Sequence, residues 1–249
     1  MSNSHQYIAL ICSLPHLGLL FSRADVPISA FRLKQRLAVL APDHARLLRD
    51  MIAVTDWAGV ARCNEDSEVL ARANKVVADL ADYPDLQHLA GTRMETRTII
   101  AALRRRRDGQ ETPGDIRGWG FGRWCTQISN NWSDPGFGLS HFMPWVPEAH
   151  QLMAAGDHIA MERLALTEVF RQLDHYGHTH QFDFEAVGIY VLRWVIVERW
   201  SRYNVKDARR RLGTLVDAAL NPSNAAPPFP LARPEPFLGQ PAIFEETAS

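Results

Sequence analysis

Most of this chain carries apolar residues at helical spacing, and no stretch shows the long apolar–polar alternation that a half-buried sheet requires. The clearest helical stripe consists of Val69, Leu70, Ala73, Val76, Val77 and Leu80. Similar stripes predict helices over residues 27–40, 42–52, 92–107, 158–177, 184–203 and 206–220, with Asp157 and Asp183 as the caps of the fourth and fifth of these. Residues 7–14 are the one segment that could form a lone strand. The pattern therefore predicts an all-α, multi-helix fold.

Residues 114–138 interrupt the helical pattern with closely spaced glycines and large aromatic residues. The aromatic side chains are Trp119, Phe121, Trp124, Trp132 and Phe137. Glycine at this density breaks regular structure, whereas aromatic rings need burial. We expect an irregular Gly/aromatic segment that packs on the helices, with a short helix over residues 123–131.

The same pattern suggests how the chain is organised. Residues 1–220 are expected to form one helical domain, which could consist of two related units, about 1–110 and 145–220, joined by the Gly/aromatic segment. Residues 221–249 are rich in proline, which removes backbone donors and prevents helix formation. We expect them to form an extended tail.

Composition excludes several classes of function. The 249 residues include 27 Lys and Arg against 28 Asp and Glu, so the net charge of −1 disfavours nucleic-acid binding by bulk attraction to phosphate. The three cysteines, Cys12, Cys63 and Cys125, are too far apart for a metal knuckle and too few for a disulfide framework.

The most apolar run, residues 186–197, is too short to cross about 30 Å of hydrocarbon. Residues 7–14 have no preceding Lys or Arg, so no signal peptide is expected.

One cluster of residues could carry metal chemistry: Asp174, His175, His178, His180 and Asp183. Imidazoles and carboxylates are ligands for zinc or iron. Gly177 is expected to end a helix between His175 and His178, and the familiar zinc-hydrolase spacings are absent. The favoured interpretation is a polar turn between helices, with no metal and no cofactor.

Two arginine clusters, residues 104–107 and 209–211, could contact an acidic partner, although a solvated surface is the simpler interpretation. The glycines of the Gly/aromatic segment do not follow the order of a phosphate-binding loop, and no Gly-x-Ser-x-Gly nucleophile motif occurs. Trp119, Phe121 and Trp124 could stack on bases, but core packing is favoured. No catalytic residue is therefore predicted.

Three segments resemble a known family. Residues 94–107 and 190–203 share an apolar helix that continues into basic residues. Both resemble the helix that recurs in the C subunit of archaeal and vacuolar-type rotary ATPases, called d in the vacuolar enzymes. The opening Tyr7-Ile-Ala-Leu-Ile-Cys-Ser-Leu-Pro-His-Leu17 is similar to the start of a bacterial family associated with vacuolar-type ATPases. The archaeal subunits contain three related helical units, and two related segments are visible here.

This resemblance implies a funnel-shaped, non-catalytic protein in the cytoplasm, peripheral to the inner membrane. Its partners would be the central stalk and the membrane rotor ring, without nucleic acid or a small-molecule substrate. The candidate contact residues are Arg104, Arg105, Arg106, Arg107, Trp119, Phe121, Trp124, Phe142 and Trp145. Two alternatives remain open: a helical metal-dependent hydrolase using residues 175–180, and a helical RNA-binding protein.

Overall fold

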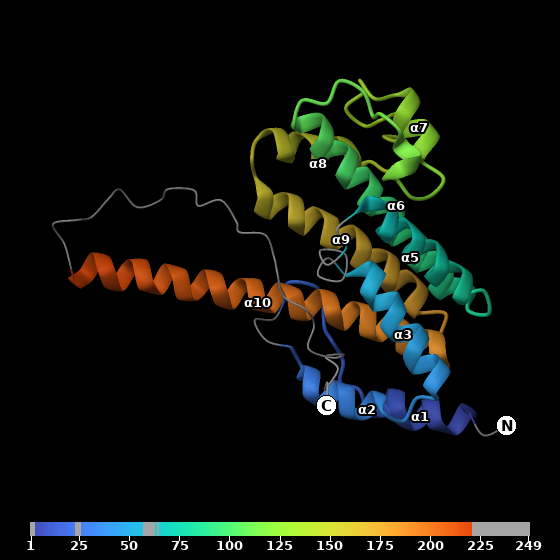
Figure 1. Cartoon of the computed structure of the whole chain (residues 1–249). Helices are drawn as coiled ribbons and strands as arrows, with labels where there is room; N and C mark the ends of the chain where they lie inside the picture. Colours follow the sequence, from blue (N-terminus) through green and yellow to red (C-terminus); the bar gives the residue numbers. More distant parts are fainter. Residues whose placement is uncertain (1–2, 23–25, 57–62, 64, 221–249) are drawn as a thin grey trace.

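The computed structural model describes residues 3–22, 26–56, 63 and 65–220, and the side chains of residues 7–202 within these ranges. This part of the chain forms nine α-helices and one short 3-10 helix, without a strand, which confirms the all-α prediction (Figure 1). The elements are α1 (Asn3–Ser13), α2 (Ala30–Leu37), α3 (Pro42–Thr55), α5 (Asp66–Asp79), α6 (Pro84–Arg107), η1 (Ile116–Gly118), α7 (Cys125–Asn130), α8 (Trp145–Ala154), α9 (His158–Gly177) and α10 (Phe184–Leu220).

Several helices begin and end at residues that the sequence identifies. The Asp157 carboxylate accepts the backbone N–H of Ala160 at the start of α9, at 2.9 Å. Asp183 accepts the N–H of Ala186 in the same way at the start of α10, at 2.7 Å. Both bonds satisfy a donor that has no partner within its own helix. These two caps and the end of α9 at Gly177 confirm the predicted boundaries.

The prediction of a possible strand over residues 7–14 is wrong, because these residues lie in α1 and its end. Tyr7 and Leu10 are buried, three positions apart, and Ile8 between them is 39% exposed. That spacing places one face of a helix on the core. A short apolar run does not distinguish a strand from a buried helix.

Two predicted boundaries also differ. The helix expected from residue 92 begins at Pro84, because proline fits the first turn of a helix, where its missing N–H is not needed. The helices expected over residues 184–203 and 206–220 form one continuous helix, α10. No proline or glycine lies between them to interrupt it.

The core consists of two clusters of buried side chains. The larger cluster joins α1, α2, α3, α5 and the first half of α6 with α9 and α10. The smaller cluster joins the second half of α6 with the Gly/aromatic segment, α8 and the start of α9. Helices α6 and α9 therefore belong to both clusters. Residues from both proposed units, 1–110 and 145–220, contribute to each of the two clusters.

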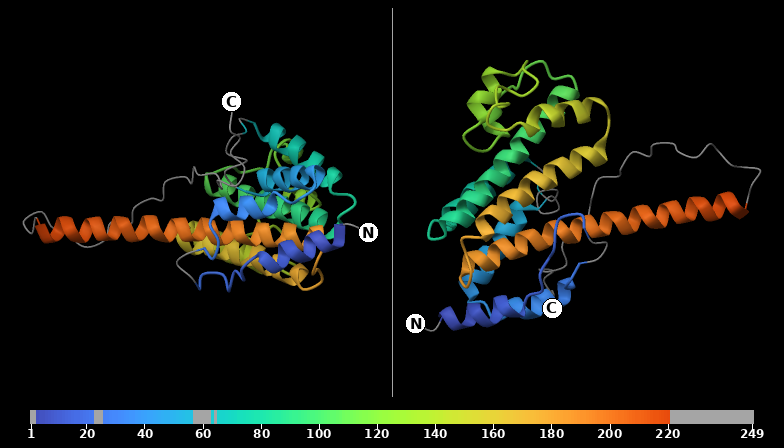
Figure 2. Two further views of the ribbon diagram at one scale, coloured as in Figure 1. Left: turned by 90° about the horizontal axis from the view of Figure 1, so that it is seen from below. Right: turned by 180° about the vertical axis from the view of Figure 1, so that it is seen from behind.

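Helix α10 is the longest element, and its 37 residues correspond to about 55 Å. It contacts α9, α6, α1 and α3, and among its described side chains, which end at residue 202, the buried ones run from Phe184 to Ser201. Its second half extends away from the other helices in every view (Figures 1 and 2). The first half lies in the core, where Val187, Val191 and Trp194 are fully buried.

Two charged residues lie on the core half of α10, and both have a charged partner. Arg193 Nη2 lies 3.1 Å from Asp174 Oδ1 on α9, and its guanidinium lies 4.8 Å from the ring centroid of Phe170. Glu198 pairs with Arg202 one turn later. Burial raises the pKa of Glu198 above its ordinary value, and the ion pair with Arg202 offsets only part of this effect.

None of the described helices combines the length and the apolar composition that crossing a lipid bilayer would demand.

Candidate functional site

The four arginines that end α6 lie in different environments. Arg106 turns toward the Gly/aromatic segment, and its guanidinium lies 4.5 Å from the ring centroid of Phe137. It also donates to Nδ1 of His150, at 3.0 Å. Its remaining hydrogen bonds go to three backbone carbonyls of the segment, those of Trp132, Asp134 and Pro135. Arg106 therefore donates to backbone carbonyls that form no hydrogen bond within a helix, and it thereby holds the irregular segment in place.

Arg105 and Arg107 are engaged differently. Arg105 Nη2 lies 2.9 Å from Asp66 Oδ2 on α5, and its guanidinium lies 4.4 Å from the ring centroid of Trp119. Arg107 is exposed and pairs with the adjacent Asp108 at 2.8 Å. Because consecutive helical residues are about 100° apart, one run of arginines reaches several surfaces.

The Gly/aromatic segment is also attached to the middle of α6. The hydroxyl of Thr98 accepts the backbone N–H of Phe121 at 2.8 Å, and the carboxylate of the buried Glu95 accepts the N–H of Arg123 at 3.1 Å. Gly122 lies between these two bonds with φ +91°, and a Cβ there would lie 2.3 Å from Cγ of Glu95. Only glycine fits this conformation and this close approach. The segment contains a short helix, α7, as expected from the sequence.

These attachments form one wall of a cavity of about 230 Å³ between α5, α6 and the segment. Its polar lining consists mainly of Arg97, Arg104 and Arg105 from α6 and Asp66 from α5. Aliphatic side chains of both helices and the rings of Trp119 and Phe121 complete it. Four of the predicted contact residues, Arg104, Arg105, Trp119 and Phe121, therefore meet around one cavity.

The other predicted contact residues do not reach this cavity. Phe142 is 67% exposed, and its ring centroid lies 5.9 Å from that of Trp124. Arg123 covers the indole of Trp124 at 4.8 Å. Trp145 is only 7% exposed and packs in the smaller core cluster. Its assignment as a partner contact must be corrected, because a buried indole in a packed core presents no surface to a partner.

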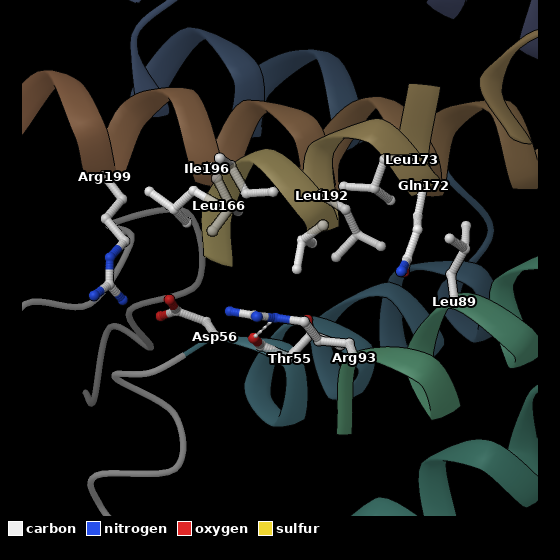
Figure 3. A pocket seen from close by; sticks show the side chains of 12 residues that line it. Thr55, Asp56, Leu89, Arg93, Leu166, Gln172, Leu173, Leu192, Ile196 and Arg199 are labelled. Atoms are coloured by element: carbon white, nitrogen blue, oxygen red, sulfur yellow. Dashed lines mark hydrogen bonds between the residues drawn. The ribbon is translucent and has the colours of Figure 1, made fainter. Parts of the chain in front are cut away.

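A second pocket, of about 40 Å³, lies between the end of α3 and helices α6, α9 and α10 (Figure 3). Leucine and isoleucine side chains of α9 and α10 line one side and face Asp56 and Arg93 on the other, and Arg199 reaches down from α10 at one end. Arg93 Nε donates to the carbonyl of Thr55 at 3.2 Å, and burial lowers the pKa of Arg93 to about 10. A space of this size holds a few water molecules. We interpret it as part of the helix packing.

The histidine side chains of residues 175–180 do not point toward a common centre. His175 and His178 are exposed, whereas His180 turns toward the first turn of α6. Its Nε2 lies 2.8 Å from Asp85 Oδ2, and its Nδ1 lies 2.9 Å from Asp183 Oδ2. Burial lowers the pKa of His180, but hydrogen bonds to Asp183 and Asp85 outweigh this effect and raise it above its ordinary value. Within the described ranges, no three His, Cys, Asp or Glu side chains are grouped so that they could hold a metal ion.

A polar chain that the sequence did not indicate links α1, α3 and α6. His44 Nδ1 bonds the hydroxyl of Tyr7, its Nε2 lies 2.6 Å from the hydroxyl of Tyr83, and its ring stacks on Phe184 at 4.4 Å. Burial lowers the pKa of His44 and raises that of Tyr7 to about 12. A neutral imidazole between two phenols donates one hydrogen bond and accepts the other. These residues are 37 and 39 positions apart, so no local spacing could reveal them.

The second arginine cluster, residues 209–211, lies on the projecting half of α10, and its side chains fall outside the described residues. Comparisons with protein-family models, curated proteins and solved structures found no match to this chain.

Proposed function

We propose that this chain is a non-catalytic subunit of an archaeal or vacuolar-type rotary ATPase, where it links the central stalk to the membrane rotor ring. In this role it lies in the cytoplasm against the inner membrane as part of the complex. The structural observation that carries the proposal is α10, which is anchored in the body over its first half and projects over its second. The sequence resemblance supplies the identity of the complex.

A coupling subunit must transmit force between two partners without deforming. The anchored half of α10 meets this requirement, because Val187, Val191 and Trp194 are fully buried on its core face. The indole N–H of Trp194 also donates to the carbonyl of Ile28 at 2.9 Å, which ties α10 to the chain before α2. A tightly packed core resists deformation, so force applied to the projecting half reaches the body.

The two helices that resemble each other in sequence, α6 and α10, are joined at their N-terminal ends. Glu185 of α10 accepts the backbone N–H of Asp85 at 2.9 Å and that of Leu86 at 3.3 Å, and thereby caps α6. Gly188 lets the two helices approach closely, because a Cβ there would lie 2.7 Å from Leu86 Cδ2. This fixed junction is consistent with a rigid adaptor.

The test uses Gly213, which lies within the projecting half of α10. Gly213→Pro should interrupt the helix, whereas the matched Gly213→Ala should strengthen it. We expect the tagged wild-type chain and Gly213→Ala to co-purify with the central stalk subunits, and Gly213→Pro to recover at least tenfold less. Urea unfolding would check that the body of each variant is intact.

Two results would contradict the proposal. If the wild-type chain recovers no ATPase subunit, the assignment to a rotary ATPase is wrong. If Gly213→Pro recovers the stalk subunits as well as the wild type does, the projecting half of α10 is not the contact, and the structural argument fails.

A further inference from the structure

Helices α1 and α2 contact each other at one edge of the body, below α10 in Figure 1 and in the view from behind in Figure 2. α1 buries Tyr7 and Leu10 in the larger core cluster, and α2 buries Leu33 and Leu37 there. Their other sides point away from that core and are exposed. We call these two exposed sides together the N-terminal face. Its residues are Ile8, Ala9, Cys12 and Ser13 of α1 and Phe31, Arg32, Lys34 and Gln35 of α2.

The N-terminal face presents apolar side chains to solvent. Among the described residues, four of the seven exposed large apolar side chains lie between Ile8 and Val39, so they are concentrated in this part of the chain. Phe31 is 69% exposed and points away from the buried side of α2. The α1 half of the face carries no formal charge, because residues 3–22 contain no Asp, Glu, Lys or Arg. Concentrated apolar exposure of this kind is typical of a surface that binds a partner or a membrane.

The charges beside Phe31 are positive. Because consecutive helical residues are about 100° apart, the ring of Phe31 lies between Arg32 and Lys34 around α2. Both side chains are exposed, and neither has a carboxylate partner within the described part of the chain. Residues 26–42 contain no Asp or Glu, and the next acidic residue, Asp43, already lies 3.7 Å from Arg46.

The balance of charge differs from that of the whole chain. Residues 1–42 contain four Lys and Arg against a single acidic residue, Asp25, which lies outside the described residues. The whole chain, by contrast, has a net charge of −1. The N-terminal face is therefore complementary to a negatively charged surface, although the protein as a whole is not.

This combination of side chains favours a lipid surface over a protein partner. Lysine is depleted from protein interfaces, where its strongly hydrated ammonium group would lose water. At a membrane, a lysine or arginine reaches the headgroups while a neighbouring aromatic ring enters the boundary between headgroups and acyl chains. A bilayer is also deformable, so a protruding ring needs no matching pocket. Anionic headgroups would neutralise the cations beside it.

We propose that the N-terminal face binds the surface of a membrane that contains anionic lipids. Phe31 and Ile8 enter the boundary between headgroups and acyl chains, and Arg32 and Lys34 contact lipid phosphate groups. This location agrees with the position at the membrane proposed above, but it does not depend on the rotary-ATPase assignment. A chain that recovers no ATPase subunit could still bind vesicles, so the two proposals fail in different experiments.

Co-sedimentation of the full-length chain with lipid vesicles tests this proposal. Vesicles of equal parts phosphatidylglycerol and phosphatidylcholine supply the negative charge, and vesicles of phosphatidylcholine alone are the neutral control. We expect binding to the charged vesicles to be about tenfold tighter than to the neutral ones and to weaken with added salt. Phe31→Ser and the double variant Arg32→Gln, Lys34→Gln should each weaken this binding about tenfold.

Matched controls change equivalent residues elsewhere. Phe142 of the Gly/aromatic segment is 67% exposed, so Phe142→Ser removes a ring of nearly equal exposure. The double variant Arg72→Gln, Lys75→Gln removes one arginine and one lysine from the exposed side of α5. Both controls should bind the charged vesicles as the wild type does. Thermal unfolding checks that every variant keeps the wild-type fold.

Several results would overturn the proposal. It is wrong if the wild-type chain does not bind the charged vesicles, if it binds the neutral ones equally well, or if the controls weaken binding as much as the variants of the N-terminal face. Sedimentation equilibrium examines the alternative that a second copy of the chain covers this face. A dimer that Phe31→Ser converts to a monomer, together with no vesicle binding, would assign the face to self-association instead.

Discussion

The imidazole of His180 is held between Asp85 and Asp183, with Nε2 2.8 Å from the first carboxylate and Nδ1 2.9 Å from the second. Only a protonated imidazole has an N–H donor on both nitrogens. Asp85 lies in the first turn of α6, and Asp183 caps α10. The charged histidine therefore ties together the N-terminal ends of the two longest helices.

This arrangement predicts that stability depends on pH through His180. The folded state raises the pKa of His180 above its ordinary 6.5, so it binds the proton more tightly than the unfolded chain does. The resulting stabilisation is complete below about pH 6.5 and is lost as the pH rises through the raised pKa. We expect His180→Gln to lower the free energy of unfolding by about 2 kcal/mol at pH 5.5 and by much less at pH 9.

Urea unfolding of both chains between pH 5.5 and pH 9 measures this difference. The control is His178→Gln, because His178 is exposed and its nearest carboxylate, on Asp174, is 3.7 Å away. A difference between wild type and His180→Gln that stays constant over the whole pH range would show that folding does not raise the pKa of His180, and the charged bridge would then be wrong.

Trp194 provides a test of the core. Its side chain is fully buried, and its indole N–H bonds the carbonyl of Ile28. We expect Trp194→Ala to lower the free energy of unfolding by about 3–5 kcal/mol, because it leaves a large cavity. Trp194→Phe keeps most of the ring and loses the hydrogen bond, which is worth about 1 kcal/mol. A loss below about 1 kcal/mol for Trp194→Ala would mean that Trp194 is not buried.

Two glycines within helices should respond in opposite directions to the same change. Apart from its chain neighbours and the nearby backbone of α6 itself, no described atom lies within 4 Å of a Cβ built on Gly91, so Gly91→Ala should stabilise the fold by about 0.5–1 kcal/mol. A Cβ on Gly188 would lie 2.7 Å from the fully buried Leu86, so Gly188→Ala should destabilise it by about 1–3 kcal/mol. Equal effects in thermal unfolding would contradict the close packing of α10 on α6.

The helical class and most helix positions could be predicted from the sequence, because they depend on local periodicity. The apolar stripe from Val69 to Leu80 matches α5, and Asp157 and Asp183 cap the helices for which they were proposed. The boundaries at Pro84 and in α1 were missed. The residues around Pro84 and those of α1 are each compatible with more than one local structure, and their packing against the other helices decides which one forms.

The contacts of the arginines at the end of α6 could not be predicted, because they join residues that are far apart in the sequence. The run from Arg104 to Arg107 was correctly singled out, but four consecutive helical residues point in four directions. Which of them faces α5, the Gly/aromatic segment or solvent is decided by residues far away in the sequence, such as Asp66 at 39 positions and His150 at 44. Arg97 was missed for the same reason: a single arginine within an amphipathic helix carries no signal until its neighbours in space are known.

We expect two adjacent arginines at the end of α6 to have different roles, Arg106 in the fold and Arg107 at the surface. Arg106 donates to backbone carbonyls of Trp132 and Pro135 and to His150, so its loss leaves acceptors without a partner at the Gly/aromatic segment. We expect Arg106→Ser to lower the free energy of unfolding by about 1.5–3 kcal/mol.

Arg107 makes one exposed ion pair with Asp108, and Arg107→Ser should change stability by less than about 0.5 kcal/mol. If the exposed end of α6 contacts an acidic partner in the proposed ATPase, Arg107→Ser should nevertheless weaken co-purification with the stalk or ring subunits, and more so at low salt. Urea unfolding and co-purification, measured on the same two variants, separate these roles. If Arg107→Ser assembles normally while Arg106→Ser unfolds easily, the run serves the fold alone, and the contact surface must be sought on α10.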